Sequence, residues 1–449
     1  MRQGFVRAVA LGSFALLSCS SPPPSSEAPP SASSVAPAPS ASAAPTGAPS
    51  AAAASPSAAP PAETAELPPA TEGADFVAQA KKLFRIAACA EGEIPPEFDR
   101  KVVDEHCEKL RPAYEKYRKG WLATAKPFLQ TVVPKGLPKR VVYPFGGGDL
   151  LTVLTVFPDA TDYNTISLEP PGDVRLVESI PKERLRGALR LTGYGVLKLV
   201  GVTYSNTVNL DKHGHAKLPG ELMLHLAALV VHGLEPTSLR YFHVNVDGSL
   251  HYLSAEEADA EGKQRHAEKE GSRAPFSGVE LRFQTPGVPG SEKVFRHFAQ
   301  DLSDEELGKT PGFRAHFDSL GQVAMMTKAA SHLLWADEFS IIRNYVLEHA
   351  AWMISDSTGI PPRYATAAGF VQDAYGTFDA PARYGPIEPL DAGAFRKLFQ
   401  EGSRPLPMQF GYSDRHHHSH MIVMRKPSTP GQPLPAVPAP PAPSAAAAP

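Results

Sequence analysis

Residues 139–172 read KRVVYPFGGGDLLTVLTVFPDATDYNTISLEPPG, and this stretch decides the fold class of the chain. A short apolar run at 141–145 is typical of a buried strand, and the three glycines at 146–148 end that strand. Apolar residues at helical spacing then predict a helix that begins at Asp149. A second strand is expected at 163–168, because two prolines and a glycine follow it.

This early strand, turn, helix and strand unit predicts an α/β fold with a mixed sheet and flanking helices. Alternating or β-branched runs predict further strands at 194–204, 239–253 (a hairpin with its turn at Asp247 and Gly248), 279–284, 293–298 and 420–425. Helical spacing predicts helices at 182–191, 219–233, 313–320, 322–335 and 339–354.

The first residues have the features of an export signal. Arg2 and Arg7 form a short basic region, and the apolar run at 9–17 is too short to span a membrane. The run leads into the letters LLSC at Cys19, which are similar to the lipobox of bacterial lipoproteins. The resemblance implies a signal peptide over 1–18 and acylation of Cys19. An ordinary secretory signal with a chance cysteine is the alternative, and export is expected in either case.

The composition divides the rest of the chain. Residues 19–72 are mostly Ala, Pro and Ser, contain no aromatic side chain and cannot form a core, so they are predicted to be a disordered, extended linker. Residues 427–449 have the same composition without a charge and are predicted to be a disordered tail. Between them we expect a helical cap at 73–138 and an α/β body at 139–426.

The charges of the body nearly cancel. The chain has 44 Lys+Arg and 47 Asp+Glu, and two of the basic and four of the acidic residues lie in the flanks. A near-neutral body gives no electrostatic basis for binding nucleic acid, so no such partner is expected. The expected partners are a bacterial membrane, with the outer membrane favoured, bound through the lipid anchor, and an envelope protein or a glycan.

The body contains two cysteines, Cys89 and Cys107. In an exported protein an isolated pair favours a disulfide. It would tie the end of a helix predicted at 74–88 to a helix predicted at 96–131. A catalytic thiol is the alternative, although nothing near either cysteine predicts an activated thiolate.

Asp149 and Glu169 are the first candidate functional residues. A glycine turn with an acid about twenty positions downstream is typical of a dinucleotide or methyl-donor site. Here the glycines read GGGD rather than GxGxxG, and a carboxylate at the helix N-terminus repels a phosphate. We therefore expect no cofactor. Asp149 either caps its helix or lines a pocket with Glu169 at the carboxyl ends of the strands.

A second candidate cluster is DSTGIPPRY at 356–364. Gly359 and Pro361 suit the end of the long helix predicted before them. That role does not account for Asp356 or for Arg363. Both are therefore candidate ligand contacts on a loop.

Histidine-rich stretches are candidate metal sites, since neighbouring imidazoles can bind zinc or copper when a carboxylate joins them. The histidines concerned are His213, His215, His416 and His418. A solvated loop is the favoured interpretation of both stretches, so no metal is expected, and His225 is expected in the core. The chain has no GxSxG, HExxH, P-loop or CxxC motif, and Ser277 has no nucleophile context in the sequence.

Four stretches, YPFGGGD, FPDATDY, SLEPPG and STGIPPRY, together resemble a family of exported bacterial proteins. That family has a YPFxGxD turn, an FPxAxxY helix end, an LEPxG strand end and a downstream SGIP loop. The resemblance covers most of 139–426 and carries no activity to any residue. The sequence therefore predicts an anchored ligand-binding or envelope-associated protein. The alternative is a hydrolase of an envelope or extracellular substrate, with candidate catalytic residues Asp149, Glu169, Asp356 and Arg363.

Overall fold

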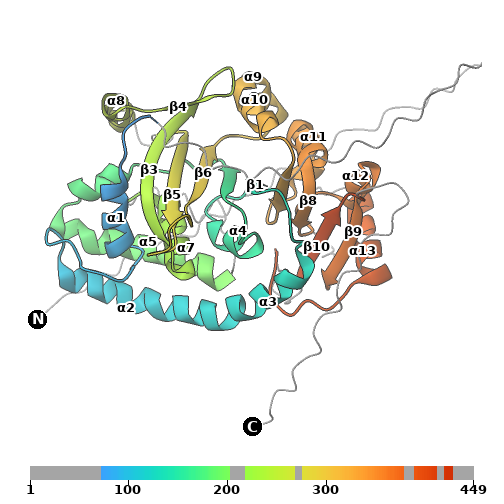
Figure 1. Cartoon of the computed structure of the whole chain (residues 1–449), viewed down its shortest axis with the longest axis horizontal. Coiled ribbons are helices and arrows are strands. Elements are labelled where there is room, and N and C mark those ends of the chain that lie inside the picture. Colours follow the sequence, from blue (N-terminus) through green and yellow to red (C-terminus); the bar gives the residue numbers. More distant parts are fainter. Residues whose placement is uncertain (1–71, 203–217, 268–275, 379–388, 412–418, 428–449) are drawn as a thin grey trace, which may run out of the picture. The chain divides into compact units, whose positions relative to one another are not determined.

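The computed structural model describes residues 72–202, 218–267, 276–378, 389–411 and 419–427 (Figure 1). They form an α/β unit on a ten-stranded mixed sheet in the order β4-β3-β5-β6-β2-β1-β7-β8-β10-β9. Strands β6, β2, β1, β7 and β8 are parallel, and antiparallel strands extend the sheet on both sides. The predicted fold class is confirmed.

The strands are β1 (Arg140–Pro144), β2 (Asp162–Ser167), β3 (Glu235–Val244), β4 (Leu250–Tyr252), β5 (Gly278–Gln284), β6 (Lys293–Ala299), β7 (Val323–Thr327), β8 (Ala350–Ser355), β9 (Val371–Gly376) and β10 (His420–Arg425). The helices are α1 (Val77–Ile86), α2 (Arg100–Tyr117), α3 (Ala123–Val132), α4 (Leu150–Val156), α5 (Lys182–Val202), α7 (Gly220–His232), α8 (Ala255–Ala267), α9 (Asp304–Lys309), α10 (Pro311–Ser319), α11 (Ser340–His349), α12 (Pro362–Ala367) and α13 (Pro389–Gly402).

The unit predicted at 139–172 forms the centre of the sheet. Strand β1 pairs in parallel with β2 on one side and with β7 on the other. Strands β2 to β6 therefore lie on one side of β1, and strands β7 to β10 lie on its other side. In open α/β sheets this switch point, at the carboxyl ends of the strands, is where ligands bind.

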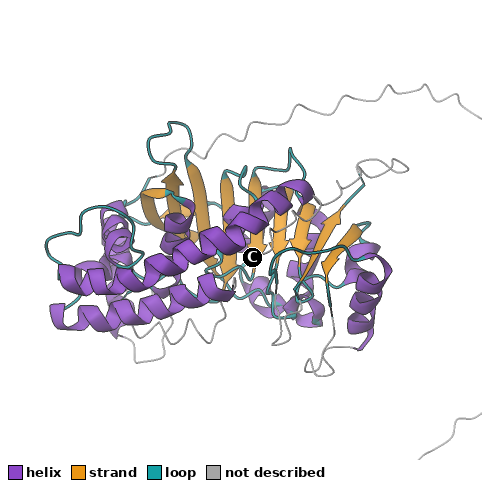
Figure 2. Ribbon diagram, turned by 90° about the horizontal axis from the view of Figure 1, so that it is seen from below, coloured by secondary structure: helices purple, strands orange, loops and turns teal. Residues whose placement is uncertain are grey.

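Side chains of β1 alternate between two cores, as a strand buried on both faces requires. Val141 and Tyr143 belong to the core beneath α1, α2, α4, α5 and α7, whereas Val142 belongs to the core beneath α10, α11 and α13. Figure 2 shows the strands side by side with helices along them. The central strands therefore have little freedom to shift, and residues at their carboxyl ends are fixed in place.

Two of the predicted helices are wrong in part. Residues predicted as a helix over 322–335 form β7 and a short 3-10 turn, and the helix predicted over 339–354 gives way to β8 after His349. A short apolar strand that is buried on both faces has no alternation, so periodicity cannot separate it from a helix. Asp356 consequently follows a strand at the carboxyl edge of the sheet and does not end a helix.

The strand expected at 194–204 is also wrong as far as Val202. Helix α5 runs without a break through Gly193, and Val196 and Leu199 are buried three positions apart. The glycines in this segment lower helix propensity, but burial of one helical face outweighs that loss. Tertiary packing therefore determines that this segment is helical, although its local sequence pattern favours a strand.

The predicted disulfide between Cys89 and Cys107 is present, with the Cα atoms 5.3 Å apart. It joins the segment after α1 to the buried face of α2, and Tyr114 donates a hydrogen bond to the carbonyl of Ala88 nearby. The helix predicted over 96–131 is α2, a π-helical turn and α3 in sequence.

Removing this disulfide, by Cys89→Ser with Cys107→Ser, is expected to lower the free energy of unfolding by about 3 kcal/mol. The loop that it closes is short, and most of the effect lies in the greater entropy of the unfolded chain. Urea unfolding of the two proteins measures the difference. An unchanged midpoint would contradict a stabilising role.

The predicted signal peptide, linker and C-terminal tail lie outside the described residues. Within the described ranges no helix is both long and apolar enough to cross a membrane.

Candidate functional site

Three of the residues named from the sequence follow strands of the central sheet. Asp149 follows β1, Glu169 follows β2 and Asp356 follows β8. Arg363 is exposed in α12, with its guanidinium 4.5 Å from the centre of the Tyr364 ring. Asp149 and Asp356 contact the adjacent residues Lys328 and Ala329, whereas Glu169 lies near Glu221 in another polar group. The histidines at 213, 215, 416 and 418 lie outside the described residues.

A buried ion pair crosses the switch point. Lys328, which follows β7, places its Nζ atom 2.7 Å from Oδ2 of Asp149 and 3.0 Å from Oγ1 of Thr152. Asp149 also accepts a hydrogen bond from the Thr152 amide and caps α4, as predicted. Burial, together with the negative charge of Asp149, raises the pKa of Tyr143 well above its ordinary value. This group fastens the glycine turn to β7.

Asp356 has a similar anchoring role beside it. Its carboxylate accepts hydrogen bonds from the Ala329 amide (3.1 Å) and from the amide and hydroxyl of Thr358 (2.9 and 2.6 Å). Ala329, Ser331 and His332 all have positive φ angles, between 52° and 63°. Non-glycine residues in this conformation cost about 1–3 kcal/mol each and persist only when neighbouring contacts hold them.

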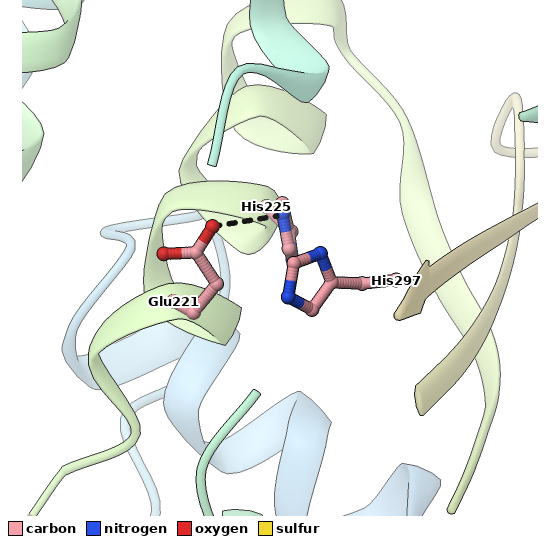
Figure 3. A group of neighbouring side chains, drawn as sticks. All are labelled: Glu221, His225 and His297. Carbon is pink, nitrogen blue, oxygen red and sulfur yellow. Dashed lines mark ion pairs between the residues drawn. The ribbon is translucent and has the colours of Figure 1, made fainter. Parts of the chain in front are cut away.

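A second polar group is buried between α7 and β6 (Figure 3). Glu221 and His225 come from one face of α7, and His297 comes from β6. The ligand atoms of these three side chains all lie within 4.8 Å of one another, and no side chain is more than 3 % exposed. The two imidazoles and the carboxyl therefore form a compact cluster of potential metal ligands.

The charges of this cluster are strongly affected by burial. Loss of water raises the pKa of Glu221 well above its ordinary value, and the negative charge of Glu169 raises it further. Burial lowers the pKa of His225 well below its ordinary value and also lowers that of His297. In all three side chains burial therefore favours the neutral form. The sequence interpretation of His225 as a core residue missed this environment.

A third group lies at the surface, and sequence reasoning missed it entirely. Nδ1 of His243 lies 2.8 Å from Oγ of Ser277, and Nε2 of the same ring lies 2.9 Å from Oε2 of Glu261. A carboxylate only accepts, so Nε2 carries the proton and Nδ1 has a lone pair for the Ser277 hydroxyl. A nucleophile, a base and an orienting acid are thus in hydrogen-bond contact.

The pairing of β3 with β5 brings Ser277 and His243 together. In this antiparallel ladder Phe242 lies opposite Gly278, so the next residue of β3, His243, lies beside the residue before Gly278. A side chain at Gly278 would meet the ring of Phe242, with a Cβ atom only 2.4 Å from it. The glycine therefore permits the close approach of these strands and keeps Ser277 next to the imidazole.

Helix α8 supplies the acid. Its N-terminus is a capping box, in which the Glu257 amide donates to Oγ of Ser254 and the Ser254 amide donates to the Glu257 carboxylate. Glu261 lies one turn further along and also accepts a hydrogen bond from the Phe276 amide at 3.0 Å. Phe276 has a φ of 71° and its ring is stacked on Tyr241. Glu261 thus orients His243 and helps to hold the strained residue before Ser277.

A cavity of about 430 Å³ opens beside this group and is lined by both Ser277 and His243. Asn245, Gln300, Lys309 and the first turn of α10 form other parts of its wall. Hydrogen bonds to two neighbouring glutamates raise the pKa of Lys309, so this side chain is a cation. The N-terminus of a helix also has a partial positive charge. Glu305 and Glu306 compensate the charge of Lys309, at 2.7 and 2.8 Å, so the first turn of α10 is the part of the wall that contributes a partial positive charge.

The sequence had only a weak signal for this group. The strands predicted at 239–253 and 279–284 were correct, but nothing local indicated that they pair with each other. Comparison with protein-family models, with curated proteins and with solved structures finds no match. The function is therefore argued from the geometry of these side chains.

Proposed function

We propose that this chain is an exported, membrane-anchored hydrolase that cleaves an ester or a related acyl bond with Ser277 as the nucleophile. One observation carries the proposal: the hydrogen-bonded series of Ser277, His243 and Glu261 at the wall of an open cavity. The reaction class is the alternative that the sequence analysis kept open, with different residues from the carboxylates named there.

The proposed reaction has two steps. The Ser277 hydroxyl attacks the acyl carbon while Nδ1 of His243 takes its proton, and Glu261 stabilises the resulting imidazolium. His243 then gives this proton to the leaving alkoxide, which departs as an alcohol and leaves the acyl group on Ser277. A water molecule attacks the acyl-enzyme with His243 again as base. The acid is released and the Ser277 hydroxyl is restored.

The helix N-terminus at the wall of the cavity suits the charge that develops in this reaction. Attack on the acyl carbon places a negative charge on its oxygen, and positive groups aimed at such an oxygen lower the barrier. Lys309 and the first turn of α10 (Pro311–Ser319) line the same cavity as Ser277. The cavity volume of about 430 Å³ is in the range of small-molecule sites, so a small substrate is favoured.

Export and anchoring are supported by separate observations. The basic and apolar segments before Cys19 resemble a lipoprotein signal. The disulfide between Cys89 and Cys107 is of the kind that persists in oxidising compartments. A hydrolase held at a membrane by residues 19–72 would act on substrates of the cell envelope or of the surrounding medium.

A biotinylated fluorophosphonate tests the proposal, because this reagent phosphonylates a serine only when a neighbouring base activates it. The mature chain is expected to incorporate one label, which peptide mass spectrometry places on Ser277, and Ser277→Ala is expected to abolish it. His251→Ala is the matched control. His251 lies in the same hairpin as His243, and its Nε2 atom likewise contacts a glutamate of α8, Glu257, at 3.0 Å.

The outcomes separate enzyme from binding protein. Labelling that survives Ser277→Ala, or a folded chain that takes up no label, would overturn the hydrolase. A pure ligand-binding role needs only the cavity. It would appear as thermal stabilisation by a compound without turnover and without labelling.

A further inference from the structure

We infer that Glu221, His225 and His297 bind one divalent transition-metal ion, of the class to which zinc belongs. Two imidazoles and one carboxylate are ligands that zinc accepts, and softer or harder ions prefer other sets. The inference does not depend on Ser277, because none of the three residues belongs to the proposed catalytic group or lines its cavity.

The geometry is close to that of a bound ion. Zinc lies about 2.0–2.2 Å from nitrogen and oxygen ligands, so a tetrahedral site brings pairs of ligand atoms to roughly 3.4 Å. Here one ligand atom from each of the three side chains lies within 4.8 Å of the other two. Figure 3 shows the side chains of α7 and β6 turned toward one another. The three side chains would have to move closer together to surround an ion.

Unsatisfied polar atoms give the second reason. Both carboxyl oxygens of Glu221 and Nδ1 of His225 are buried without a hydrogen-bond partner among the described residues, and so is Oε1 of nearby Glu169. Buried polar atoms are nearly always paired, because an unpaired one costs about 1–3 kcal/mol. One cation would pair the Glu221 and His225 atoms at once. The negative charge of Glu169 would add to its attraction.

The imidazoles are also held in the way that metal-bound histidines are held. Nε2 of His225 lies 3.4 Å from the carbonyl oxygen of Gly147, and Nε2 of His297 lies 2.7 Å from that of Glu169. Carbonyls only accept, so each Nε2 donates and each ring keeps one lone pair. A second ring nitrogen that donates to a backbone carbonyl is the usual outer partner of a metal-binding histidine. On His297 the lone pair now accepts from Thr165, at 3.0 Å.

Burial assigns the ion a structural role. Since the three ligands are at most 3 % exposed, no open position faces solvent. The ion would tie α7 to β6 and, through the Gly147 and Glu169 carbonyls, to the ends of β1 and β2. Three protein ligands are also the number found in catalytic zinc sites, so the structural role is inferred from burial and not from the ligand count.

The test measures zinc bound to the mature chain after dialysis by inductively coupled plasma mass spectrometry. It also measures the melting temperature with and without added Zn²⁺. We expect one ion at this site and a rise in melting temperature that a strong chelator reverses. Glu221→Gln is expected to bind one ion fewer and to lose that rise. His232→Gln is the matched control, because His232 is a half-buried imidazole of the same helix that contacts the Leu151 carbonyl.

The Glu221→Gln variant is expected to fold, which keeps the test decisive. Glutamine has the length and shape of glutamate and places no charge in this buried position, and His225, His297 and Glu169, which face Glu221, are unchanged. A metal-free variant that unfolds as cooperatively as the metal-free wild type shows that the fold is kept. An equal zinc content in wild type and variant, or a wild type that neither holds nor takes up zinc, would overturn the site.

Discussion

Glu261→Gln is expected to lower the rate at which fluorophosphonate modifies Ser277 by roughly 10⁴-fold, the loss that follows when the orienting carboxylate of a serine protease becomes an amide. The cause is the tautomer of His243. A glutamine can keep its oxygen toward the Phe276 amide, which Glu261 now contacts through Oε1, and then presents its NH₂ group to Nε2 of His243. The ring must then accept at Nε2 and carry its proton at Nδ1, where it can no longer accept from Ser277.

The measurement is the second-order rate constant of inactivation, which needs no knowledge of the substrate. Glu257→Gln makes the same chemical change one helical turn away. The Glu257 carboxylate contacts His251, which does not belong to the proposed catalytic group. That variant is expected to react at the wild-type rate. Equal rates for all three proteins would show that Glu261 only docks α8 against the sheet.

The sequence predicted the centre of the fold because its signals are local. The run before Gly146, the cap at Asp149 and the prolines after Glu169 each act within a few residues, and β1, α4 and β2 form where they were expected. The sequence pattern predicts helix at β7 and β8, because apolar runs that are buried on both faces lack the alternation of a strand. Their identity depends on neighbouring strands that the local pattern does not reveal.

The candidate sites depended even more on distant pairing. The cap at Asp149 was predictable, but its partner Lys328 is 179 positions away and only the pairing of β1 with β7 brings them together. Adjacent histidines were considered as metal ligands, whereas the buried cluster takes His225 and His297 from different elements. Ser277 lacks the sequence motif of a nucleophile because a β-ladder and the helix α8 supply its partners.

Breaking the buried ion pair is expected to destabilise the fold by about 3–5 kcal/mol, because either change leaves one charge buried and unpaired. Lys328→Met leaves the carboxylate of Asp149, and Asp149→Asn leaves the ammonium. Asparagine is chosen because it also caps helices well, so the loss reports the charge and not the cap of α4. The exposed pair of Arg100 and Asp104 is the control, and Asp104→Asn is expected to change stability by less than about 1 kcal/mol.

The double variant, Asp149→Asn with Lys328→Met, distinguishes a buried pair from two independent contacts. With both charges of the pair gone, neither partner is left buried and unpaired, so the variant is expected to be more stable than either single one. Urea unfolding at pH 7 of all four proteins gives the coupling free energy. Losses that simply add would mean that water reaches these charges. Labelling of Ser277 should persist in every variant that folds, because Asp149, named from the sequence as a catalytic candidate, anchors the sheet without entering the proposed reaction.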